Sequence, residues 1–555
     1  MAAGVKRPVN IFKLKNLGEP KEVFNWRLWF AVLSFALLGA ARGVDEGLIS
    51  GAFNSQNFQR SIKYTSYSKV EQANIKANIS AMVQIGSVGG ALIAFLVCDR
   101  IGRIWATRQL CVLWIVGISI LMASNGNLGA IYTGRFIAGL GVGQTPVVGP
   151  IYIAEITPAS IRGICTCLFT GFVYLGIVLA YFTNYGCQVN LGDRTAARWQ
   201  VPTSLHIMFA GLILVLTLAQ SESPRYLIMR GRQEEALRVM SRLRKLPQHH
   251  DYVVSEISTI KAAHLEETEG TKHSGWLGIL KEAFVEPSNL YRIMLTIGAQ
   301  IFSQWSGAGS ITLYAPDLFH LLGIPDTNTT LLVTAVFGIV KLVAAVLCAL
   351  FLVDVIGRKR SLLLGIACQA VAMIYVAAFL TAVPQLGMHV EASGMLTGSQ
   401  MAGSKGAVAM IYLSGFGWAL GWNSMQYLLT AELFPLRIRA FCTSLAMTFH
   451  FANQYGNSRA VPNLLLPVAD GGISPPGTFW FFAAVTVLGG FWVWFIVPET
   501  AGRSLESMDR LFSLPWYKIG RYGNQEAEAR DERRSFAGEK AQDLQVTAVT
   551  EVEDK

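Results

Sequence analysis

Charged residues are scarce in this chain. Only 15% of its 555 residues are Asp, Glu, Lys or Arg, and 52% are hydrophobic. Soluble domains carry about a quarter charged residues, so these charges are too few to cover soluble surfaces. A soluble enzyme and a disordered regulator are therefore excluded as descriptions of the whole chain. The composition indicates a membrane protein, with the lipid bilayer as its main partner.

Patterns for metal binding and bond chemistry are also missing. The 8 cysteines form no CxxC pair and have no histidines at metal-ligand spacing, so neither a metal site nor a disulfide framework is indicated. No Ser/His/Asp constellation is present. The run from Gly139 to Gly143 follows no strand, which excludes a nucleotide-binding loop. We therefore predict that the protein is not an enzyme and holds no metal or cofactor.

Long apolar segments are abundant instead. Most are near the roughly 20 residues that cross a bilayer as a helix. Twelve can be counted, at 27–50, 79–98, 109–124, 129–154, 164–185, 201–219, 292–315, 331–353, 361–383, 406–430, 441–466 and 478–497. We expect an all-α membrane protein with twelve transmembrane helices.

The net charge of +10 reflects the orientation of the chain in the membrane rather than binding to nucleic acid. Arginine and lysine gather in the loops at 99–108, 222–291 and 354–360, as they do in cytosolic loops of membrane proteins. Both termini are then cytosolic. Asn328 starts an N-x-T pattern, the acceptor for N-glycosylation, on a loop that we expect outside the cell. The sequence leaves two interpretations open: a glycosylated asparagine and an unused acceptor.

The long loop after the sixth segment divides the helices six plus six. It contains two stretches with helical apolar spacing, at 233–246 and 251–267. The expected organisation is a cytosolic N-terminus at 1–26, a six-helix bundle at 27–221, a cytosolic helical loop at 222–291, a second six-helix bundle at 292–510 and a largely disordered cytosolic tail at 511–555.

Two motifs occur once in each half. DRIGR at 99–103 follows the second segment, and DVIGRKR at 354–360 follows the eighth. YIAEITP at 152–158 corresponds to AELFPLR at 431–437. Glycine permits a tight turn, and the acids and arginines can form charge-assisted bonds beside it. We expect these ion pairs to latch a gate at the cytosolic side.

With SESPR at 221–225 and PETAGRSLE at 498–506, these motifs resemble the sugar porter family of the major facilitator superfamily over about residues 25 to 510. The resemblance implies two bundles that rock around a central site. It also implies a transporter without a cofactor, which we expect to be a monomer. The expected gate residues are Asp99, Arg103, Glu155, Arg162, Glu222, Arg225, Asp354, Arg358, Glu432, Arg437 and Glu499.

The first apolar segment contains two acids, Asp45 and Glu46, in RGVDEGLISG at 42–51. Acids inside a membrane are costly and usually functional. In proton-coupled sugar porters an aspartate in this motif carries the proton, so the resemblance assigns that role to Asp45 and makes Arg135 its partner. Helix neighbours point about 100° apart, so Glu46 is not expected to face Arg135 as well. An external ion pair near the helix end is its alternative role.

Several positions at which hexose porters hold sugar hydroxyls are changed. Thr170 stands where the family usually has a glutamine, and SQWSGAGSITLY at 303–314 keeps only Gln304 and Tyr314 of the usual seventh-helix pattern. Gln426 and Tyr427 replace the family's Pro-Trp pair. The resemblance therefore does not extend to the usual recognition of hexoses.

Lys341 lies about ten residues into the eighth segment, roughly 15 Å from either end. Its stem is too short to bring the ammonium to the interface, and exposure to lipid would cost at least about 2.5–3.5 kcal/mol. We expect it to face the central cavity and bind a carboxylate. Arg459 is a weaker candidate, nearer the outer face. The expected substrate-binding residues are Lys341, Gln304, Thr170, Ser303, Tyr314, Gln426, Tyr427 and Arg459.

These cations suit a polyhydroxylated carboxylate. With PKEVFNWR at 20–27, they resemble the fungal branch of the family that carries quinate and galacturonate-type sugar acids. The leading hypothesis is proton symport of such an acid into the cell across the plasma membrane. One alternative is symport of a neutral hexose or pentose, with Lys341 paired permanently to Asp45 or Glu46. A nutrient sensor of the same fold is the other.

Overall fold

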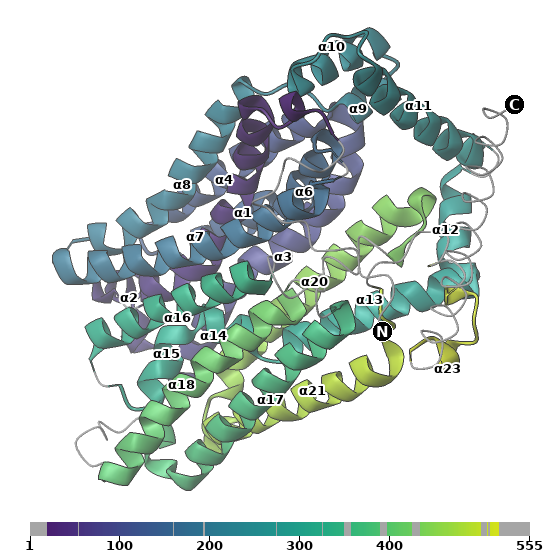
Figure 1. Cartoon of the computed structure of the whole chain (residues 1–555). Coiled ribbons are helices and arrows are strands. Elements are labelled where there is room, and N and C mark those ends of the chain that lie inside the picture. Colours follow the sequence, from purple (N-terminus) through teal and green to yellow (C-terminus); the bar gives the residue numbers. More distant parts are fainter. Residues whose placement is uncertain are drawn as a thin grey trace, which may run out of the picture.

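A computed structural model describes residues 19–53, 55–158, 160–192, 195–272, 275–324, 326–348, 357–388, 397–423, 433–500, 508 and 511–520. The secondary structure of these residues is helical, with no strand among them. The helices form two bundles, purple to blue for the first half of the chain and teal to yellow for the second (Figure 1). Of the tail at 511–555 that was expected to be largely disordered, residues 511–520 are described and include the short helix α23 (Trp516–Ile519), and residues 521–555 lie outside the described residues.

The first bundle accounts for the first six apolar segments. Its helices are α1 (Trp26–Phe53), the short α2 (Gln56–Ser61), α3 (Lys69–Ile101), α4 (Arg103–Met122), α5 (Leu128–Val142), α6 (Thr145–Ile156), α7 (Arg162–Asn190) and α8 (Ala197–Leu218). The fourth segment is divided into α5 and α6 because Pro146 lacks the N–H that would continue the ladder of α5.

The second bundle accounts for the other six. Its helices are α13 (Pro287–Trp305), α14 (Ala308–Leu313), α15 (Ala315–Leu321), α16 (Thr327–Leu347), α17 (Arg358–Ala382), α18 (Gly398–Leu420), α20 (Leu436–Leu464) and α21 (Ser474–Ile496). The segment expected as one helix at 292–315 is broken between α13 and α14, where Gly307 has φ +86°. Asn328 is exposed in the first turn of α16.

Length and composition support a membrane-spanning fold. Among the described residues, nine spans are long and apolar enough to cross a membrane, one of them formed by α5 and α6 together. The remaining three segments are represented by α13 with α14, by α18 and by α20. The prediction of an all-α protein with twelve membrane segments is therefore confirmed.

Four helices connect the bundles: α9 (Pro224–Met229), α10 (Gln233–Arg244), α11 (Asp251–Lys272) and α12 (Gly275–Val285). They gather at one end of the molecule (Figure 1), which we call the connector end. Arg244 attaches them to the first bundle, because it pairs with Glu256 of α11 at 2.7 Å and donates to the carbonyl of Ile156 in α6. The two helices expected in this loop are α10 and α11.

A row of glycines fixes the orientation of α1. Gly39, Gly43 and Gly47 are spaced by four residues, so they share one face of the helix. A methyl group at Gly43 would collide with the carbonyl of Val173 in α7. The glycine face therefore packs closely against α7, as small residues allow between membrane helices. This contact determines where the polar side chains of α1 point.

The bundles meet along two helix pairs, α3 with α20 and α7 with α16. Polar contacts join them at the end opposite the connectors. Lys76 of α3 pairs with Asp317 of α15 at 2.6 Å, and Arg459 of α20 donates to the side chain of Asn74 at 2.9 Å. The bundles are therefore tied together at this end.

Candidate substrate and proton sites

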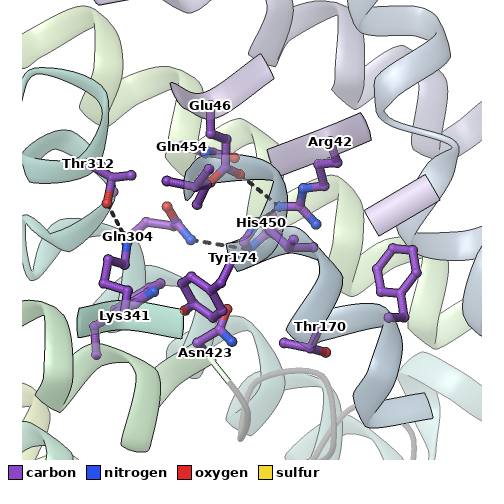
Figure 2. Close-up of a pocket in the computed structure, with 15 residues that line it drawn as sticks. Arg42, Glu46, Thr170, Tyr174, Gln304, Thr312, Lys341, Asn423, His450 and Gln454 are labelled. Carbon is purple, nitrogen blue, oxygen red and sulfur yellow. Dashed lines mark hydrogen bonds and ion pairs between the residues drawn. The ribbon is translucent and has the colours of Figure 1, made fainter. Parts of the chain in front are cut away.

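A cavity lies between the bundles, with about 530 Å³ of empty space that includes its opening. Figure 2 shows the side chains that surround it. Polar and charged side chains outnumber the apolar ones in its lining, so the wall offers many hydrogen-bonding groups. The polar and charged lining residues are Arg42, Glu46, Thr170, Tyr174, Gln304, Thr312, Lys341, Asn423, His450 and Gln454.

Lys341 reaches this cavity from α16. Its Nζ donates to the hydroxyl of Thr312 at 2.6 Å and lies 5.3 Å and 5.4 Å from the ring centres of Tyr174 and Phe337. Gly415 of α18 leaves room for the lysine stem, because a methyl group there would press on the Lys341 Cγ. The ammonium is thus surrounded by aromatic faces and a neutral hydroxyl.

Carboxylates of the described residues form no ion pair with Lys341. The two acids considered as permanent partners are paired elsewhere: Asp45 with Arg135 and Glu46 with Arg42. Lys341 therefore contributes a positive charge to the cavity that no described acid contacts directly.

Glu46 faces the cavity. The sequence had suggested a different position as an alternative, namely an ion pair near the outer end of α1. Its carboxylate lies 3.5 Å from the guanidinium of Arg42, one helical turn earlier. Figure 2 shows both side chains entering from α1, opposite Lys341. The salt bridge has little access to solvent, since the side chains are 5% and 21% exposed.

His450 of α20 also contacts Arg42, with 3.2 Å between Nε2 and Nη2. Arginine can only donate, so Nε2 must accept and the proton of the ring lies on Nδ1. Nδ1 lies 2.9 Å from the Oε1 of Gln300, to which it donates, and 3.2 Å from the side-chain amide of Gln304. These contacts define an uncharged His450 that links the two bundles.

Asp45 lies on a different face of α1 and does not line the cavity. Its Oδ1 is 2.8 Å from the Nη1 of Arg135, and both side chains are buried. Arg135 is oriented by a second bond, from Nε to the carbonyl of Ile79. The structure therefore brings together the two residues that the sequence suggested as a proton-coupling pair.

His206 of α8 is a third member of this group. Its Nε2 is 3.3 Å from the Oδ1 of Asp45, and its Nδ1 is 3.0 Å from the carbonyl of Thr203. A carbonyl only accepts, so Nδ1 carries a proton and Nε2 faces the carboxylate. The signal for His206 in the sequence is its position within an apolar segment, where a polar side chain is costly.

The expected substrate residues divide into two groups. Lys341, Gln304 and Thr170 line the cavity. Ser303, Tyr314 and Arg459 do not line it, and their role in substrate binding stays a prediction: Ser303 donates to the carbonyl of Gln300, Tyr314 donates to the carbonyl of Ser458, and Arg459 binds Asn74. Gln426 and Tyr427 lie outside the described residues.

Several cavity residues were not singled out from the sequence as substrate-binding. Arg42, Asn423, His450 and Gln454 are polar groups within expected membrane segments, a cost that itself signals function. Tyr174 and Thr312 carry no such signal, because tyrosine and threonine are common in apolar helices. Their place in the cavity follows from helix packing that a linear pattern does not contain.

At the connector end, Arg103 binds two acids of its own bundle. It lies 3.1 Å from Asp99 and 2.8 Å from Glu155. Glu222 accepts bonds from the backbone N–H groups of Arg103 and Ile104, so it caps the first turn of α4. Burial raises the pKa of Glu222, and these backbone donors oppose the shift.

The second bundle repeats this cap. Glu499 accepts from the backbone N–H groups of Arg358 and Lys359 at the start of α17. Gly102 and Gly357 precede the two capped helices with φ of +93° and +97°, and a methyl group at either would meet the capping carboxylate. The repeated sequence motifs therefore fold into a repeated corner, whose capping acids were expected only as ion-pair partners.

Two further expected gate residues begin helices at this end. Arg162 is the first residue of α7, and Arg225 lies in the first turn of α9. Asp354 and Glu432 lie outside the described residues, as does the side chain of Arg437.

The profile of the family described as "Sugar (and other) transporter" matches residues 31–512. The chain is a multi-pass membrane transporter. It belongs to this family, the sugar porters of the major facilitator superfamily.

Curated relatives include fungal quinate permeases. The "Probable quinate permease" of Aspergillus niger is 31% identical, over 89% of this chain and 89% of that protein. The "Quinate permease" of Emericella nidulans is 30% identical, over 89% of this chain and 90% of that protein. These relatives are permeases rather than enzymes.

Solved structures share the fold. The proton:xylose symporter XylE bound to 6-bromo-6-deoxy-D-glucose has a TM-score of 0.71 at 23% identity, over 87% of this chain and 99% of that chain. An inward-open structure of XylE from E. coli has a TM-score of 0.68 at 22% identity, with the same coverage.

Proposed function

We propose that this transporter is a proton-coupled symporter that imports quinate or a related sugar acid across the plasma membrane as a monomer. The observation that carries the proposal is the ammonium of Lys341, which lies on the central cavity and donates to the neutral hydroxyl of Thr312. The relatives named as quinate permeases support the same class of substrate.

A bound carboxylate would supply the counter-ion of Lys341. Burying an ammonium is costly unless it is paired, so a substrate anion that reaches Nζ gains a charge-assisted hydrogen bond and offsets that cost. Hydroxyl groups of the substrate would bind Gln304, Asn423 and Gln454, because amide side chains both donate and accept hydrogen bonds.

The proton would bind at Asp45. With Arg135 at 2.8 Å the carboxylate is held in its charged form, and separation of the pair during transport would favour protonation. His206 faces the same oxygen through Nε2, so a proton shared between the two atoms would be hydrogen-bonded on both sides. One helix, α1, carries both this site and part of the cavity wall.

Alternating access gives each end of the molecule a gate. We assign the connector end to the cytosol, because its loops are rich in arginine and lysine. The contacts Lys76–Asp317 and Arg459–Asn74 then close the outer side and must break when the carrier opens outward. The ion pairs of Arg103 lie on the inner side.

The decisive test measures uptake and current together. The protein would be expressed in a host that lacks its own carriers and supplied with labelled quinate, galacturonate or glucose. One proton with one monoanion moves no net charge, whereas one proton with a neutral sugar moves one charge, worth about 2.3 kcal/mol per 100 mV. We expect pH-driven uptake of an acid without depolarisation. Robust glucose uptake that neither acid inhibits would refute the proposal.

Symport of a neutral monosaccharide is the second candidate. The amides of Gln304, Asn423 and Gln454 favour it, since amide groups are suited to sugar hydroxyls. This function would appear in the same assay as glucose or pentose uptake that depolarises the membrane. Binding of glucose without uptake would instead indicate a nutrient sensor.

A further inference from the structure

The charges around the cavity can be counted. Among the described lining residues, Arg42 and Lys341 are cations and Glu46 is a carboxylate. His450 accepts from Arg42 and is uncharged. Two positive charges and one negative charge leave a net charge of +1 facing the substrate.

The single acid is placed between the two cations. Glu46 pairs with Arg42 at 3.5 Å, and its charge also acts on Lys341 across the cavity. Arg42 has two further contacts, with His450 at 3.2 Å and with the ring of Phe451 at 5.3 Å. The guanidinium is thus held in place, and Glu46 neutralises it while Lys341 has no such partner among the described acids.

We propose that Glu46 determines the charge of the substrate: it restricts the cavity to monocarboxylates and excludes dicarboxylates. This inference rests on the proposed function, in which Lys341 binds a substrate carboxylate. A monoanion brings the cavity to neutrality. A second carboxylate could reach a cation only at Arg42, where Glu46 already lies, and like charges repel strongly at such distances in a poorly solvated site.

This role differs from that of Asp45. The two acids are neighbours in sequence but face different groups: Asp45 contacts Arg135 and His206 away from the cavity, whereas Glu46 contacts Arg42 on its wall. Loss of the Glu46 charge should therefore alter substrate choice without removing the proposed proton site.

Galactonate and galactarate form a matched pair of probes, because both are open six-carbon chains and differ only at C6, which is a hydroxymethyl group in galactonate and a second carboxylate in galactarate. Uptake of labelled quinate or galacturonate, whichever the wild type carries, would be measured with each unlabelled acid as competitor. The wild type should be inhibited far more weakly by galactarate than by the monoacid. The Glu46→Gln variant keeps the size of the side chain and frees Arg42 for a second carboxylate.

One freed charge-assisted bond should shift the ratio of the two inhibition constants roughly 10- to 100-fold in favour of galactarate. Removal of the second cation in the double variant Glu46→Gln/Arg42→Gln should restore the preference for the monoacid. An unchanged ratio in Glu46→Gln would overturn the inference, and so would a double variant that keeps the gain.

Two controls keep the result interpretable. If Glu46→Gln fails to reach the membrane, the Arg42→Gln variant tests the inference by itself. It should weaken uptake of the monoacid and should not strengthen inhibition by galactarate. A gain for galactarate in that variant would refute the role of Arg42 and Glu46. A wild type that carries no acid at all would instead refute the proposed function, so the two failures are distinguishable.

Discussion

Replacement of Lys341 by methionine tests the proposed substrate site most directly. Methionine has a similar length but no charge, and the position is buried at 2% exposure. Thr312 loses the bond from Nζ but still donates its hydroxyl proton to the carbonyl of Ala308 at 2.9 Å. No buried donor is left without a partner, so we expect Lys341→Met to fold and reach the membrane.

The expected effect follows from the bond that is lost. A hydrogen bond to a charged group contributes about 1.5–3 kcal/mol, and each 1.4 kcal/mol is about tenfold in affinity. The KM for quinate or galacturonate should therefore rise roughly 10- to 100-fold. The variant Thr312→Val keeps the charge of Lys341 and removes only the neutral hydroxyl that accepts its hydrogen bond. KM should therefore rise only by the equivalent of one neutral hydrogen bond, about 1 kcal/mol or about fivefold.

The assay is initial uptake of the labelled acid against concentration, normalised to the amount of protein at the cell surface. Thermal unfolding of the purified variants separates weaker binding from weaker folding. An unchanged KM in Lys341→Met, with normal surface expression, would remove Lys341 from the substrate site. Equal losses in Lys341→Met and Thr312→Val would show that the hydroxyl rather than the charge determines binding.

Three further variants test other parts of the structure. The side chain of Asp45→Asn cannot bind and release a proton, so this variant should lose pH-driven accumulation of substrate. It should still exchange labelled for unlabelled substrate, which counterflow in vesicles would measure. Persistent uphill uptake would contradict the role of Asp45 in proton coupling. Gly43→Val should prevent the close contact of α1 with α7 and lower the unfolding temperature of the purified protein well below that of Gly163→Ala, where a methyl group meets nothing. Asp317→Asn should weaken the outer contact with Lys76 by at most about 1 kcal/mol and increase labelling of cysteines introduced in the cavity by external reagents; unchanged labelling would argue against an outer gate.

Features that depend on local sequence were predicted well. Each membrane segment is recognised by its length and hydropathy, so all twelve expected segments contain helices. The helices α10 and α11 were recognised by their apolar spacing. The break at Gly307 was not predicted, because a glycine in an apolar run is compatible with both a helix and a turn.

Features that depend on packing were predicted less completely. The acids of the repeated motifs were expected in ion pairs, and Arg103 does bind Asp99 and Glu155. The caps formed by Glu222 and Glu499 require carboxylates far along the chain to meet the first turns of α4 and α17, which spacing alone does not reveal. Likewise, the contact of His450 with Arg42 joins residues 408 positions apart.

The arrangement of α1 provides a physical route for coupling in the proposed mechanism. Its glycine face is pressed against α7, Asp45 points to Arg135, and Glu46 points into the cavity. Because neighbouring side chains of a helix are held about 100° apart, any rotation or tilt of α1 that separates Asp45 from Arg135 must also move Glu46 and change the field at Lys341. Protonation and substrate binding would therefore bias the same rigid element, which is the requirement for energetic coupling between two sites.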